Sequence, residues 1–158
     1  MKVVKNGAIA CGLALLCAAG FAATARAETF QLDDTASLPS ETTALLRWRD
    51  FSRADHSQAT LEGAVAVAVR LNLTPVLNRT GRLYLVLPEQ GTTPVRVRWA
   101  TQGRLLPGEI APGQRVVVYQ GPVTTAYLDE TLALEIEADG NYLPGMQRLD
   151  FHFEFDAD

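Results

Sequence analysis

Residues 149–156 read Leu-Asp-Phe-His-Phe-Glu-Phe-Asp, an unbroken alternation of apolar and polar side chains. Successive side chains of a β-strand point to opposite faces, so this stretch predicts a strand with one apolar and one charged face. Such a strand is half-buried, because only one of its faces is suited to a protein core. The stretch therefore predicts a sheet that covers one side of a core.

The same alternation recurs along the chain. Turn-forming residues separate the runs, among them Pro112-Gly113, which suits the central positions of a type II turn. The spacing predicts an all-β protein of about seven to eight strands. Besides 149–156, the runs are 45–51, 64–73, 82–87, 95–99, 115–119 and 132–139, with an optional further strand at Thr29–Leu32.

We expect these strands to form a single antiparallel β-sandwich of immunoglobulin-like layout, two sheets packed face to face. A small closed β-barrel is the alternative. Residues 38–47 are a candidate short helix, because Ser40 is suited to cap a helix N-terminus. The sandwich is expected over residues 44–158, after a Thr-, Ser- and Asp-rich N-terminal arm at residues 28–43 that is more loosely held.

Residues 1–27 have the three parts of a cleaved secretory signal peptide. Two lysines give a positive start, an apolar run follows at residues 8–23, and Ala25-Arg26-Ala27 fits a cleavage site before Glu28. A retained membrane anchor is the alternative, but about 16 apolar residues are few for a spanning helix. We therefore expect an exported protein, periplasmic or at the surface of a bacterial cell, with no membrane span after cleavage.

The two cysteines, Cys11 and Cys17, both lie inside this apolar run. Leu16 precedes Cys17, which does not suit a lipoprotein signal because that signal has a small residue before the cysteine. Cleavage before Glu28 would leave a chain without disulfides, thiol nucleophiles or thiolate metal sites. The domain would then be held together by its core alone, for which its size is sufficient.

Charge is distributed unevenly over the 158 residues. The chain has 14 basic and 18 acidic residues, and residues 129–158 hold nine acids against one arginine. A net negative charge argues against general nucleic-acid binding. The pairs Arg47/Arg49 and Arg96/Arg98 each lie on one strand face, and we interpret them as partners of acids on neighbouring strands rather than as an anion site.

Neither of the two histidines lies in a catalytic motif. Asp55-His56-Ser57 are neighbours in sequence, whereas the members of a catalytic triad meet in space. His152 lies on the charged face of the last strand. Asp139-Gly140-Asn141 resembles part of a calcium loop but lacks the distal glutamate, so a tight turn is the better interpretation. We expect no enzymatic activity, no bound metal and no cofactor.

Aromatic side chains supply the candidate interaction sites. Trp48 and Trp99 are both expected to point into the core. The candidates are the apolar face of the last strand, for strand addition, and tyrosines at strand ends or loops. These residues are Leu149, Phe151, Phe153, Phe155, Tyr119, Tyr127 and Tyr142.

Together these features predict an exported, non-enzymatic structural or accessory subunit of a cell-surface or envelope assembly, whose general layout resembles that of fimbrial subunits. It would bind a protein partner, or assemble with itself, by strand pairing through the arm or the last strand. A periplasmic ligand-binding or inhibitor module with a site on loops 101–113 and 121–130 is the alternative. A small enzyme with a histidine beside a carboxylate is a third.

Overall fold

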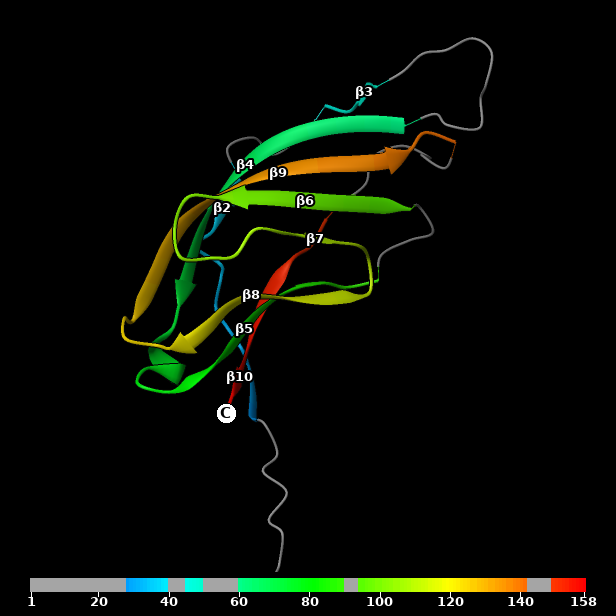
Figure 1. Cartoon of the computed structure of the whole chain (residues 1–158). Coiled ribbons are helices and arrows are strands. Elements are labelled where there is room, and N and C mark those ends of the chain that lie inside the picture. Colours follow the sequence, from blue (N-terminus) through cyan, green and yellow to red (C-terminus); the bar gives the residue numbers. More distant parts are fainter. Residues whose placement is uncertain (1–27, 40–44, 50–59, 90–93, 142–148) are drawn as a thin grey trace, which may run out of the picture.

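The computed structural model describes residues 28–39, 45–49, 60–89, 94–141 and 149–158. In these residues the chain forms ten strands and a short 3-10 helix, η2 (Thr74–Val76), and no α-helix. The strands form two antiparallel sheets that lie one above the other and do not close into a barrel (Figure 1). The all-β prediction is confirmed, the arrangement is consistent with a β-sandwich, and the closed-barrel alternative is wrong.

The first sheet has four strands in the order β1-β10-β5-β8. β10 lies in its interior, because β1 pairs with one of its edges and β5 with the other. Glu28 at the start of β1 is therefore in register with Ala157 near the end of the chain. The bounds are β1 Glu28–Gln31, β5 Thr80–Leu87, β8 Gln114–Pro122 and β10 His152–Ala157.

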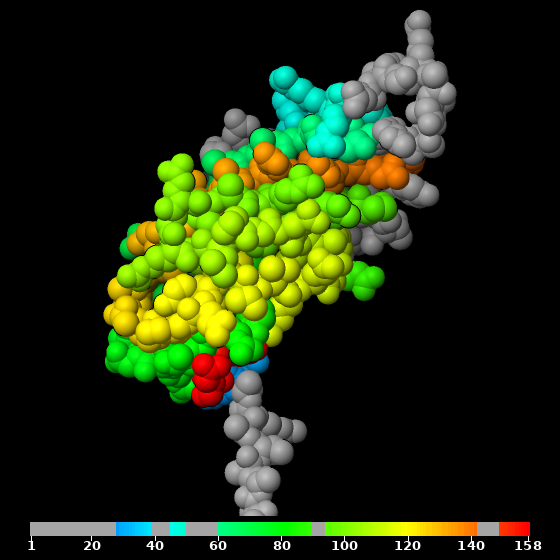
Figure 2. Space-filling model, viewed as in Figure 1, coloured from blue at the N-terminus to red at the C-terminus, as the bar shows by residue number. Residues whose placement is uncertain are grey.

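The second sheet has six strands. Its path runs β2-β4-β9-β6-β7, and β3 also pairs with β4. β4 and β9 pair along 13 residues each, and in the space-filling view β9 forms an orange band between β4 and β6 (Figure 2). The bounds are β2 Leu38–Pro39, β3 Arg47–Trp48, β4 Thr60–Asn72, β6 Val95–Thr101, β7 Gly108–Ile110 and β9 Tyr127–Asp139.

The core lies between the two sheets, and the alternating residues fill it. Along β6, Val95, Val97 and Trp99 are buried, while the two arginines between them are exposed. Along β10, Phe153 and Phe155 are 3 % and 1 % exposed. Full burial of each such side chain contributes roughly 1.5–3 kcal/mol. The prediction that Trp99 packs in the core is confirmed.

The N-terminal segment joins the two sheets. After β1, the N–H of Leu32 donates to the carbonyl of Phe153 at 2.9 Å, and Asp33 then forms a bridge with Asn72 of β4. Leu32 is buried in the core, which ties the segment to the sandwich. The described part of the expected arm, residues 28–39, thus supplies β1 to one sheet and β2 to the other.

The turn from β7 to β8 also carries the chain from one sheet to the other. Pro112 and Gly113 occupy its central positions, Gly113 has a φ of 80°, and the N–H of Gln114 donates to the carbonyl of Ala111 at 3.1 Å. Only glycine adopts this φ without strain. The predicted type II turn is confirmed.

Two predictions about residues 38–48 are wrong. The ends of the expected helix at residues 38–47 are the strands β2 and β3, which pair with the long edge of β4; residues 40–44 lie outside the described residues. Trp48 is in register with the buried Leu61 but is itself 48 % exposed. It lies on a two-residue strand at the margin of the sheet, where the core no longer covers it.

Candidate functional site

The predicted interaction residues at the last strand lie against the core. Phe153 and Phe155 are buried within it, and Leu149 and Phe151 are half-buried and pack against it. β10 is also paired along both edges, so its backbone groups are already engaged. Another strand pairs with β10 only if β1 or β5 is displaced.

The predicted tyrosines lie apart from one another. Tyr142 lies outside the described residues. Tyr127 is 52 % exposed, and the guanidinium of Arg70 lies over its ring at 5.5 Å from the centroid. Tyr119 is half-buried, and its hydroxyl donates to the carbonyl of Pro122 at 2.8 Å. Of these tyrosines, Tyr119 shares a hollow with a residue of the last strand, Phe155.

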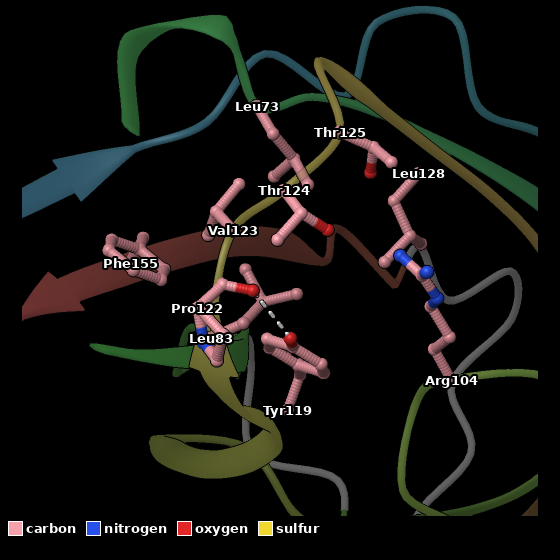
Figure 3. Close-up of a pocket in the computed structure, with 10 residues that line it drawn as sticks. All are labelled: Leu73, Leu83, Arg104, Tyr119, Pro122, Val123, Thr124, Thr125, Leu128 and Phe155. Carbon is pink, nitrogen blue, oxygen red and sulfur yellow. Dashed lines mark hydrogen bonds between the residues drawn. The ribbon is translucent and has the colours of Figure 1, made fainter. Parts of the chain in front are cut away.

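This hollow, the Arg104 hollow, opens between the loop after β6 and the loop that joins β8 to β9 (Figure 3). Buried core side chains form its floor, and more polar and more exposed residues form its rim. Its cavity volume is about 10 Å³, the room that one water molecule occupies. The floor is Leu73, Leu83, Val123, Leu128 and Phe155, and the rim is Arg104, Tyr119, Pro122, Thr124 and Thr125.

Glu130 of β9 fixes one wall of the Arg104 hollow. Its carboxylate accepts hydrogen bonds from the N–H groups of Gly103 at 3.0 Å, Arg104 at 2.9 Å and Leu105 at 3.1 Å, and from the hydroxyl of Thr101. A Cβ at position 103 would lie 2.5 Å from the carboxyl carbon, so a larger residue there would have to displace the Glu130 carboxylate. Hydrogen bonds to a charged group are strong, so these bonds stabilise the conformation of the loop.

The rest of this wall is tied to both sheets. The indole N–H of Trp99 donates to the carbonyl of Leu106 at 2.8 Å. The N–H of Leu106 in turn donates to the carbonyl of Val118 in β8 at 2.7 Å, and Leu105 is buried in the core. Arg104 therefore projects from a backbone that is fixed on both sides.

The opposite wall is held by a different set of bonds. The N–H of Val123 donates to the carbonyl of Arg79, and the N–H of Asn78 donates to the carbonyl of Val123, both at 2.8 Å. The N–H of Leu73 donates to the carbonyl of Ala126, also at 2.8 Å. Because each wall has its own partners, the gap between them is a preformed feature of the fold.

Arg104 gives the hollow its positive charge. Among the residues that the structure describes, no acid forms an ion pair with it. Figure 3 shows its side chain beside Leu128, with the hydroxyl oxygens of Thr124 and Thr125 directed into the space next to it. A guanidinium and two hydroxyls are donors suited to the oxygen atoms of an anion.

Comparison with family models, curated proteins and solved structures found no match. The function is therefore inferred from geometry. Within the described residues, no three His, Cys, Asp or Glu side chains are grouped so as to hold a metal ion, and no helix there is long and apolar enough to span a membrane. His56 lies outside the described residues, and His152 lies on the charged face of β10, 3.2 Å from Glu154.

The outer face of the second sheet carries a chain of ion pairs. Arg98 lies 3.0 Å from Glu109 and 3.4 Å from Glu137, and Arg96 lies 3.3 Å from Glu109. Arg49 contacts Glu137 from the other side at 2.7 Å. The hydrogen bond to Glu109 raises the pKa of Arg98. The interpretation as partners of acids on neighbouring strands is confirmed for Arg49, Arg96 and Arg98.

The outer face of the first sheet depends on Arg115. Its guanidinium donates twice to Asp156, at 2.7 and 2.8 Å, and once to Glu154 at 2.8 Å. It also lies over the ring of Tyr84 at 3.5 Å. Hydrogen bonds from Arg115 and, to a lesser extent, from Thr29 lower the pKa of Asp156, and the bond to Asp156 raises the pKa of Arg115.

Exposed apolar side chains lie along the edge of the second sheet beside β4. Leu38, Leu45 and Trp48 are 67 %, 75 % and 48 % exposed. β2 and β3 each pair with only two residues of β4. A sheet edge with weak pairing and exposed apolar side chains is prone to associate with another chain. We call residues 38–39 and 45–48 the apolar edge.

Sequence reasoning finds only part of the Arg104 hollow. It identifies loops 101–113 and 121–130 as the place for a site, but it does not bring Arg104, Thr124 and Thr125 together. The available signal was an arginine with no acid within four positions on either side. Such an arginine has no local partner with which to form an ion pair.

Proposed function

We propose that this chain is an exported, non-enzymatic β-sandwich protein of immunoglobulin-like layout that serves as a structural or accessory subunit of a cell-surface or envelope assembly. The observation that carries the proposal is the apolar edge. Leu38, Leu45 and Trp48 remain exposed there. Burial of such side chains against a protein partner is favourable by about 25 cal/mol per Å².

The predicted cleavage site lies directly before the described part of β1. Cleavage is expected before Glu28, and β1 is described over Glu28–Gln31. Its carboxylate lies 2.7 Å from Arg79, whose guanidinium also lies over the ring of Phe30 at 4.7 Å. A cut at this bond would keep the pairing of residues 28–31 with β10 and these side-chain contacts, as the proposed export requires.

The pairing of the strands favours one place for the partner. Strand addition takes place at sheet edges, because interior strands have both sides occupied. β10 is interior, whereas β2 and β3 form an edge. We therefore place the partner strand, from another protein or a second copy, at the apolar edge rather than at the last strand.

Photocrosslinking in the producing cell tests this function. A photoreactive amino acid replaces Trp48 or, as a matched control, the exposed Arg82 on the outer face of the first sheet. We expect position 48 to crosslink to one defined envelope protein or to a second copy, and position 82 to give no such product. Equal products at both positions, or a cytosolic chain that retains Met1 by mass spectrometry, would overturn the proposal.

A second candidate function is a periplasmic ligand-binding or inhibitor module with a site on loops. The Arg104 hollow favours it, because its walls lie on the two loops where such a site was predicted. The substitutions Trp48→Ser and Arg104→Gln separate the two functions. If only the cell with Trp48→Ser behaves like one that lacks the protein, the assembly-subunit function is supported. If only the cell with Arg104→Gln does so, the ligand-binding function is supported.

A further inference from the structure

The Arg104 hollow combines hydrogen-bond donors at its rim with an apolar floor. We infer that it binds a carboxylate carried on a small apolar group, the chemistry of a short-chain carboxylic acid and of a peptide C-terminus. The inference deepens the second candidate function, ligand binding at the loops, and rests on it.

The donors at the rim select a planar anion. The guanidinium of Arg104 presents parallel N–H groups that match the two oxygens of a carboxylate. The hydroxyls of Thr124 and Thr125 point into the same space (Figure 3) and are able to donate to an oxygen that the guanidinium leaves free. No acid among the described residues forms an ion pair with Arg104, so binding of an anion does not require such a pair to break.

The apolar floor and the small size of the hollow favour a carboxylate that is attached to a small apolar group. Leu73, Val123 and Leu128 are 5 %, 4 % and 7 % exposed, so an atom that enters between them meets hydrocarbon. The cavity volume of about 10 Å³ admits one water-sized group, such as a methyl. A phosphate ion is polar on every side and has no part to place there.

The two walls keep the hollow open before the ligand arrives. Glu130 holds the backbone at Arg104, and Arg79 and Asn78 hold the backbone at Val123. A site whose loops are already ordered loses little conformational entropy on binding. Both carboxylate oxygens of Glu130 already accept hydrogen bonds from backbone N–H groups of the loop at residues 103–105.

An NMR titration of the ¹⁵N-labelled protein tests the site. The protein is purified from the cell as it is found there, as the full chain or cleaved before Glu28. The probes are sodium propionate and propionamide, its uncharged counterpart, at constant ionic strength. We expect propionate to shift the amide signals of residues 104, 124 and 125 in a saturable way. Propionamide should bind the wild type with a Kd at least about tenfold higher than that of propionate. Propionate should bind the variant Arg104→Gln with a Kd raised by at least about the same factor. In both cases a hydrogen bond to a charged group is lost.

The control variant is Arg82→Gln, which removes an exposed arginine of the first sheet and should leave the Kd unchanged. A tripeptide that ends in alanine, with a free or an amidated C-terminus, then identifies the source of the carboxylate. Tighter binding of the free peptide than of propionate assigns a peptide end, and the reverse assigns a small acid. Shifts that do not saturate, or that persist unchanged in Arg104→Gln, would overturn the inference and leave the crosslinking result at position 48 unaffected.

Discussion

The outer faces of the two sheets both carry arginines and carboxylates, yet the two faces connect them differently. On the first sheet, one cation, Arg115, binds Glu154 and Asp156 together. On the second sheet, several arginines share two acids, Glu109 and Glu137. On the first sheet, loss of the shared arginine removes an ion pair from both acids. On the second sheet, each acid retains one arginine when the other is lost.

The two faces also differ in exposure to solvent. The side chain of Arg115 is 33 % exposed and that of Asp156 is 19 % exposed, against 46 % for Arg98 and 44 % for Glu109. Water and salt weaken an exposed ion pair, which contributes about 0–1 kcal/mol. The contact between Arg115 and Asp156 should therefore contribute more than the contact between Arg98 and Glu109.

The substitution Arg115→Ala should give the largest effect. It leaves Glu154 and Asp156 without their shared cation and removes the contact with the ring of Tyr84. We expect a loss of about 1–2 kcal/mol in the free energy of unfolding, measured by urea denaturation. Arg115→Lys keeps the charge but not the forked geometry, and should fall between the wild type and the alanine variant.

Acid should reduce this difference between the two faces. The pKa of Asp156 is lowered by Arg115 in the folded state, so its ionised form stabilises the fold above the unfolded pKa of about 3.9. That stability is lost as the pH falls through the lowered folded pKa. Unfolding midpoints measured from pH 7 downward should therefore converge for the wild type and Asp156→Asn, and the gap to Arg115→Ala should narrow to what the Tyr84 contact contributes. A gap that stays constant below pH 3 would contradict this account.

Arg98→Ala on the second sheet should give the smallest effect. Glu109 keeps Arg96 and Glu137 keeps Arg49, so neither acid is left alone. We expect a smaller shift of the urea midpoint than Arg115→Ala produces. The double variant Arg49→Ala with Arg98→Ala removes both partners of Glu137, and its loss should exceed the sum of the two single losses.

The sequence predicts those parts of the fold that depend on strand periodicity. The alternation in residues 149–156 assigns Phe153 and Phe155 to the core, and both are buried there. The arginines of β6 are in register with acids of β9, Arg96 with Glu137, as their spacing indicated. Periodicity is a local property, so it can be read without knowledge of the neighbouring strand.

The features that the sequence does not predict depend on contacts between distant residues. Trp48 follows the alternation, but its exposure is decided by the position of β3 at a sheet margin. The loop at Arg104 takes its shape from Glu130, which lies 26 residues further along the chain. Thr124 lines the same hollow because β7 and β8 return the chain to the end of the fold at which β6 ends. Neither pattern nor propensity contains this information.

The pairing of β1 with β10 places the two ends of the described fold side by side. The interior strand of the first sheet is the last one to be synthesised, so β1 and β5 have nothing between them until residues 152–157 are available. Pairing between segments far apart in the chain also makes folding slow, because the intervening loop must close first. Under the proposed export, this order would leave the first sheet incomplete until β10 has been made.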